Sequence, residues 1–156
     1  MQGSISENRV LELASAMSET GACEIILADT VGYANPTQVK SLFSRLKNYI
    51  GNLPMAAHFH DTRGMGLANV VSALEAGVRR FDATMAGLGG CPFAPGASGN
   101  IATEDCVYML ENMGFSTGIN FKALLELRTH LSEILPDETL EGKLSFAKPA
   151  INSLAS

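Results

Sequence analysis

Apolar and polar positions along the chain follow two different periods in successive segments. Apolar residues spaced three and four apart predict helices, whereas short uninterrupted apolar runs predict strands. The expected helices cover residues 6–21, 35–51, 66–77, 102–114 and 121–135, and the expected strands cover residues 22–29, 54–60 and 78–87. Strand and helix therefore alternate three times, an order typical of a parallel α/β sheet or barrel.

Several of these segments begin with residues that favour a helix start. Ser4 or Ser6 is placed to cap the first helix, and Asn35 precedes a proline, Pro36, at the first helical position of the second. Asn120 is placed to cap the last helix. These residues support the boundaries that the apolar period gives.

The composition is that of one globular domain. The chain has 156 residues, of which 46% are hydrophobic, enough for a single core over residues 1–135, followed by a loosely ordered C-terminal tail over residues 136–156. A net charge of −5 without a basic block argues against nucleic acid or a membrane as the partner. Three unpaired cysteines, no signal-peptide pattern and no long apolar run favour a reducing, cytoplasmic location.

Polar residues gather where the expected strands end. Asp29 ends the first strand, His58 and His60 end the second, and a glycine-rich loop over residues 87–100 follows the third. Parallel α/β proteins carry their chemistry at the carboxyl ends of strands. We therefore expect these groups to converge on one face.

His58 and His60 are the sharpest local signal. Residues two apart on a strand point the same way, so both imidazole rings could reach one metal ion. Two histidines with ordinary structural roles explain the spacing equally well. Asp61 and Thr62, which come next, could support the rings through hydrogen bonds.

The loop GLGGCPFAPGASGN contains two further candidates. Cys91 is either an inert small side chain or an acid, base or nucleophile, and the surrounding glycines favour the chemical role because they make burial difficult. Asn100 most simply caps the following helix, and the alternative is that its side-chain oxygen binds a hard cation. We expect no chemical role for Cys23, Cys106 and His130.

The segment HFHDTRGMGLANVVSALEAGVRRFDATMAGLGGCPFAPGASGNIATEDCVYML, residues 58–110, resembles the hydroxymethylglutaryl-CoA lyase family. The family's hallmarks are an H-x-H-D-T strand end and a G-L-G-G-C-P loop that runs on to A-S-G-N-x-A-T-E-D. The resemblance extends back through residues 24–39 and forward through residues 113–127. It therefore covers most of the chain apart from the tail.

The resemblance implies a partial TIM (β/α)8 barrel, made of about its last three β/α units. It also implies metal-dependent cleavage of 3-hydroxy-3-methylglutaryl-CoA to acetyl-CoA and acetoacetate, a retro-Claisen reaction of acyl-CoA metabolism, leucine degradation and ketone body formation. The partners would be an acyl-CoA substrate and further copies of the chain. The roles implied are Mg²⁺ or Mn²⁺ ligands for His58, His60 and Asn100, a loop acid/base on a closing lid for Cys91, an active-site carboxylate for Asp29 and a supporting residue for Glu104.

The chain also departs from the family pattern. A complete barrel has roughly 250 residues, and the family's first-strand R-D-G segment does not occur here. Arg63, in HDTRG, belongs to a different element and does not replace that arginine. Two alternatives therefore stay open: a lyase for another 3-hydroxyacyl-CoA or citramalyl-type substrate, and a catalytically inactive fragment. We expect the isolated chain to self-associate or to be loosely packed, and to lack lyase activity.

Overall fold

The structure is a computed structural model that describes residues 5–90 and 99–144. These residues form two compact units. The first unit is made of the described residues within Met1–Asp82 and Gly90–Asn100. The second unit is made of the described residues within Ala83–Gly89 and Ile101–Ser156. In this part of the chain no helix has the length and apolar character needed to cross a membrane.

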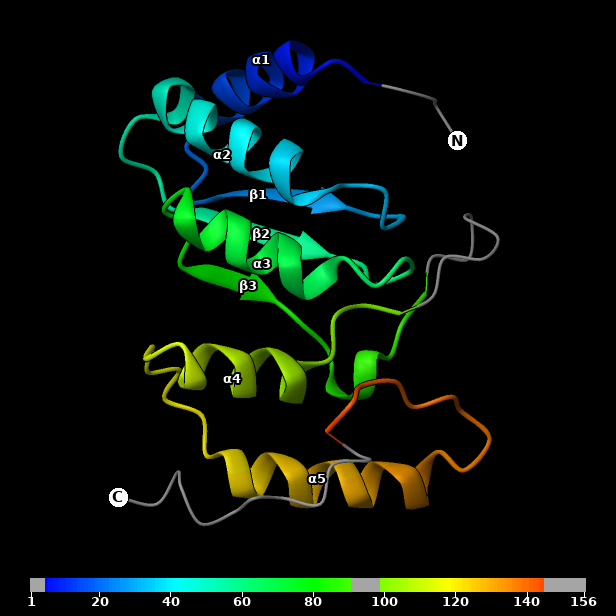
Figure 1. The fold of residues 1–156 in the computed structure, drawn as a ribbon. Helices are drawn as coiled ribbons and strands as arrows, with labels where there is room; N and C mark the ends of the chain where they lie inside the picture. Colours follow the sequence, from blue (N-terminus) through cyan, green and yellow to red (C-terminus); the bar gives the residue numbers. More distant parts are fainter. Residues whose placement is uncertain (1–4, 91–98, 145–156) are drawn as a thin grey trace. The chain divides into compact units, whose positions relative to one another are not determined.

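The first unit contains a three-stranded parallel sheet. Its strands are β1 (Ile25–Asp29), β2 (Met55–Phe59) and β3 (Arg80–Asp82), and β2 lies between the other two. The apolar runs that predicted strands account for all three. The parallel pairing places all three carboxyl ends at one edge of the sheet, as the strand and helix alternation predicts (Figure 1).

Three helices belong to the same unit: α1 (Glu7–Ser18), α2 (Pro36–Ile50) and α3 (Gly66–Glu75). α2 packs against α1 and α3, and α3 also contacts β2 (Figure 1). The predicted caps are confirmed, because Ser6 Oγ accepts the Arg9 N–H and the Asn35 side chain accepts the Gln38 N–H. The core of the unit includes the buried apolar side chains Leu11, Val39, Phe43, Leu46, Ala57, Phe59 and Val70.

The second unit contains a short 3₁₀ turn, η1 (Met85–Gly87), and two helices, α4 (Thr103–Asn112) and α5 (Phe121–Ile134). The predicted cap of α5 is confirmed, since Asn120 Oδ1 accepts the Ala123 N–H at 3.0 Å. The two helices contact each other, and α4 contacts η1.

The strand predicted over residues 78–87 is too long. β3 ends at Asp82, and Ala86 has a left-handed backbone with φ of 55°. The Thr84 carbonyl accepts the Gly87 N–H, and the Thr84 hydroxyl donates to the Leu88 carbonyl at 2.6 Å. Thr84 still forms an isolated parallel bridge with Ala102, but turn hydrogen bonds replace the strand ladder from Met85 onward, which the apolar run alone does not reveal.

The prediction of a loosely ordered tail is wrong for residues 141–144. The Asp105 carboxylate accepts the N–H groups of Lys143 and Leu144 at 2.7 and 3.0 Å, and the Glu141 N–H donates to the Ala86 carbonyl at 2.8 Å. These hydrogen bonds fix the segment on the start of α4 and on η1. Residues 145–156 lie outside the described residues.

Candidate metal centre

His58 and His60 lie at the carboxyl end of β2. Their ring centroids are 5.2 Å apart with an interplanar angle of 63°, as the two-residue period of a strand predicts for side chains on one face. His60 is buried, whereas His58 is partly exposed. The two rings therefore lie within the distance at which one small ligand can contact both.

Asn100 lies beside His60 although the two are forty positions apart in the sequence. The two residues form an isolated antiparallel bridge, and the Asp61 N–H donates to the Gly99 carbonyl at 3.2 Å. Asn100 is buried. The simpler prediction for Asn100 is wrong, because Ala102 occupies the N-cap position of α4. The chain returns to the end of β2 first and enters the helix three residues later.

The donor set fits part of the shell of a divalent cation. Two imidazole nitrogens and an amide oxygen are ligands that Mg²⁺, Mn²⁺ and Zn²⁺ all accept, so these residues do not select the metal. Within residues 5–90 and 99–144, no three side chains of His, Cys, Asp or Glu gather as a complete ligand group. The remaining ligands would have to be water, substrate or other protein groups.

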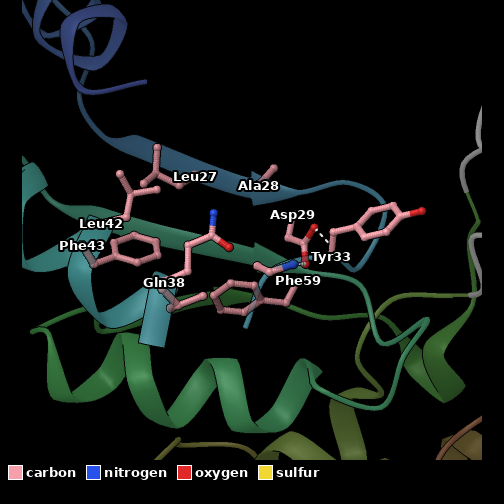
Figure 2. Close-up of a pocket in the computed structure, with 10 residues that line it drawn as sticks. Leu27, Ala28, Asp29, Tyr33, Gln38, Leu42, Phe43 and Phe59 are labelled. Carbon is pink, nitrogen blue, oxygen red and sulfur yellow. Dashed lines mark hydrogen bonds between the residues drawn. The ribbon is translucent and has the colours of Figure 1, made fainter. Parts of the chain in front are cut away.

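Asp29 has a different environment. Its two carboxylate oxygens accept the N–H groups of Tyr33 and Ala34 at 3.0 and 2.9 Å (Figure 2). Because Ala28 is the residue paired with His58, Asp29 alternates to the opposite face of the sheet, where it lines a pocket of about 210 Å³. The structure therefore uses this carboxylate to shape the turn after β1 and does not bring it to the histidine face. Its catalytic role stays a prediction.

The loops after β1 and β2 are joined by Arg63. Its guanidinium donates to the carbonyls of Val31 and Gly32 at 2.9 and 3.1 Å and lies 3.7 Å from the centre of the Tyr33 ring. Asp61 Oδ1 accepts the Gly66 N–H at 2.6 Å and so supports the start of α3. Arg63 and Asp61 thus hold the two loops that border the histidines.

Glu104, in the second unit, is fully buried. Its Oε2 accepts the Ala86 N–H at 3.1 Å, and its Oε1 forms an ion pair with the Arg128 guanidinium. The carboxylate thereby stabilises the left-handed turn at the start of the glycine-rich loop. This geometry favours the supporting role that the family resemblance implies, which stays a prediction.

The three cysteines and His130 show no sign of a chemical role or lie outside the residues that the structure describes. Cys91 falls outside the described residues. Burial, with a smaller contribution from the Asp105 carboxylate, raises the pKa of the Cys106 thiol to about 11, which agrees with an inert side chain. Cys23 is exposed, and His130 is exposed on α5 with its Nδ1 3.5 Å from Glu133.

Two residues near the candidates were not found by sequence reasoning. Asp82, the last residue of β3, has its Oδ2 3.6 Å from Nδ1 of His58, and Arg128 on α5 is the partner of Glu104. An aspartate at a strand end is a usable signal, but strand register is needed to place it next to His58. Nothing in the helical pattern distinguishes Arg128 from an exposed arginine.

The family model described as HMGL-like matches residues 1–131. The chain therefore belongs to the HMGL-like family. It is 44% identical over 130 residues to the hydroxymethylglutaryl-CoA lyase of Pseudomonas mevalonii, covering 83% of this chain and 43% of the relative. It is 43% identical over 155 residues to the (R)-citramalyl-CoA lyase of Chloroflexus aurantiacus, covering 98% of this chain and 49% of the relative.

A solved structure supports the same family. The HMG-CoA lyase of Acinetobacter baumannii, in complex with coenzyme A and 3-methylmalate, matches 97% of this chain and 50% of its own, with 46% identity and a TM-score of 0.90. The chain thus spans about half the length of the relatives it matches and corresponds to their carboxyl-terminal portion. The predicted fold, part of a TIM barrel, is confirmed.

Proposed function

We propose that this chain supplies the carboxyl-terminal part of the active site of a divalent-metal-dependent carbon–carbon lyase that cleaves 3-hydroxy-3-methylglutaryl-CoA. The observation that carries the proposal is the bridge between His60 and Asn100, which brings a buried amide to two histidines on one face. The family membership and the lyase relatives support the reaction class.

In this proposal His58, His60 and Asn100 hold Mg²⁺ or Mn²⁺. The cation, when bound, makes the substrate's tertiary hydroxyl more acidic. Burial of His60 and Asn100 keeps water from that side of the site and fixes both side chains. These residues therefore act by binding and orientation, and proton transfer is left to other groups.

The proton transfers follow from the bond that breaks. A base takes the hydroxyl proton, the oxygen forms the new ketone of acetoacetate, and the electron pair of the broken carbon–carbon bond passes to the acetyl-CoA enolate. The enolate carbon must then receive a proton, and we assign that transfer to the thiol of Cys91. Glu104 supports the turn from which the loop carrying Cys91 begins.

A second substrate is favoured by one comparison. The chain is 43% identical to a citramalyl-CoA lyase and 44% identical to a hydroxymethylglutaryl-CoA lyase, so similarity alone does not favour one substrate over the other. Citramalyl-CoA also carries a tertiary hydroxyl β to the thioester, and the same bond cleavage gives pyruvate in place of acetoacetate. The two products can therefore be distinguished in one assay.

The test is complementation of a split barrel. The full chain is co-expressed with the amino-terminal half of the Bacillus subtilis hydroxymethylglutaryl-CoA lyase, which is 47% identical to this chain over 125 residues. With Mg²⁺ or Mn²⁺ present, we expect the pair to release acetoacetate and the chain alone to release none. His58→Ala should abolish the activity and His130→Ala should retain it.

Two outcomes would contradict the proposal. A pair that co-purifies but cleaves neither substrate would favour a chain without catalytic function. Equal activity in the His58→Ala and His130→Ala pairs would remove the histidine assignment. Self-association of the chain alone stays a prediction, which light scattering on the same samples measures.

A further inference from the structure

The third strand places a carboxylate beside His58. Asp82 is paired with His58 in the register of β2 and β3, and its Oδ2 lies 3.6 Å from Nδ1 of the ring. The side chains are 57% and 28% exposed respectively, so neither is closed off from a ligand. The mechanism above gives Asp82 no role.

A carboxylate at this position affects which ring nitrogen carries the proton. The separation is longer than a direct hydrogen bond, so the effect comes from charge. A neutral ring with its proton on Nδ1 directs a positive dipole toward Asp82, whereas the other tautomer directs a lone pair toward it. The contact thus favours the Nδ1–H tautomer, which leaves the lone pair of His58 on Nε2. Imidazole in unstructured peptides prefers the opposite tautomer.

We propose that Asp82 is a positioning residue that orients the His58 ring and holds it in the Nδ1–H tautomer, so that Nε2 is available to a divalent cation. Metal-binding histidines commonly have their second nitrogen fixed by a carboxylate in this way. The inference rests on the proposed function, because the cation is what makes the orientation of His58 useful.

The chain contains a matched comparison. Nδ1 of His130 lies 3.5 Å from Glu133, nearly the same separation, but those side chains are 69% and 70% exposed. Water screens that pair and both side chains move more freely, so Glu133 should bias the His130 tautomer less than Asp82 biases that of His58. Glu133→Ala therefore serves as a control that removes a carboxylate next to a histidine outside the candidate centre.

The test reads the tautomer directly and without metal. Long-range ¹H–¹⁵N NMR spectra of the full chain, with ¹⁵N-labelled histidine, are recorded at about pH 8.5, above the usual titration range of imidazole. We expect His58 to be mainly Nδ1–H in the wild type and mainly Nε2–H in Asp82→Ala. Asp82→Asn, which keeps the side chain's size without its charge, should shift His58 in the same direction. Glu133→Ala should leave His58 unchanged.

A second measurement links the tautomer to metal binding. Mn²⁺ is titrated into the same samples, and the concentration that half-broadens the ring signals of His58 and His60 is determined. We expect this concentration to rise about tenfold in Asp82→Ala and to stay unchanged in Glu133→Ala.

The outcomes separate this inference from the proposed function. A wild-type His58 in the Nε2–H form, a tautomer unaffected by both Asp82 variants, or Mn²⁺ broadening that is the same in Asp82→Ala would overturn the positioning role. Wild-type spectra in which Mn²⁺ broadens neither His58 nor His60 would instead contradict the metal site itself, whichever tautomer His58 holds.

Discussion

Two polar clusters of the molecule, one in each unit, satisfy their charged groups in opposite ways. In the first unit, the cluster at the end of β2 is partly open, with His58 and Asp82 accessible and 3.6 Å apart. In the second unit, Glu104 is fully buried and both of its oxygens already have partners, the Arg128 guanidinium and the Ala86 N–H. The first arrangement can still accept a ligand, whereas the second is complete without one.

This difference in burial and pairing helps to assign separate roles to residues that belong to the same sequence motif. His58, His60 and Glu104 all belong to the segment that resembles the lyases. A buried carboxylate that pairs with arginine would have to break that pair to act as a base, which is costly. We therefore propose that the histidine cluster carries the chemistry and that Glu104 supports the backbone.

The largest effect is expected from breaking the buried pair. Arg128→Ala leaves the Glu104 carboxylate buried without its cation, so the free energy of unfolding should fall by about 3–5 kcal/mol. Urea unfolding measures the change. The matched control is Arg9→Ala, which removes an exposed partner of Glu12 and should cost less than about 1 kcal/mol. Equal losses of unfolding free energy in the two variants would mean that the buried pair stabilises the fold no more than the exposed pair does.

A smaller effect should follow from the buried thiol of the second unit. The folded-state pKa of Cys106 is about 11 against an ordinary value of 9.0, so the folded chain keeps the proton in this range while the unfolded chain loses it. The free energy of unfolding should therefore decrease between these two pH values, by roughly 2–3 kcal/mol from this group.

The same urea experiment, repeated across this pH range, isolates the contribution of Cys106. Cys106→Ala should remove that part of the decrease, and Cys23→Ala, at an exposed thiol, should retain it. If the free energy of unfolding of Cys106→Ala decreases as much as that of the wild type, the pH dependence has another source and the pKa of the Cys106 thiol is not raised by burial.

The smallest effect concerns the loops that border the histidines. Gly32 has φ of 66°, and a Cβ there would lie 3.0 Å from Cβ of Thr62 in the neighbouring loop. Gly64 has φ of 70°, and a Cβ there would meet nothing within 4 Å. Both alanine variants bear the cost of a left-handed backbone, so Gly32→Ala should be destabilised more than Gly64→Ala by about 1 kcal/mol. Equal thermal stabilities would show that the two loops adjust without cost.

Much of the fold was predictable because local signals and the final structure agree. Asn35 and Pro36 begin α2, Asn120 begins α5, and apolar runs supply the three strands. One exception is the segment after β3, where Ala86 in η1 is left-handed. A non-glycine residue in that conformation carries no sequence signal, since it is stabilised by Glu104, which is eighteen positions away.

The candidate centre was predictable only in part. The strand period of two placed His58 and His60 on one face, but the position of Asn100 follows from a bridge to His60 that no local pattern gives. Asp82 became a candidate only with the register of β3 against β2. Contacts between segments that are far apart in the sequence depend on tertiary packing, so a single sequence does not predict them.

The central claim is that the histidines at the end of β2 bind a divalent cation. The most direct test measures Mn²⁺ binding to the full chain, by the relaxation of water protons, in the wild type and in His58→Ala, His60→Ala and His130→Ala. We expect the wild type and His130→Ala to bind equally and the other two variants to bind at least about tenfold more weakly. Equal binding by all four proteins would contradict the claim.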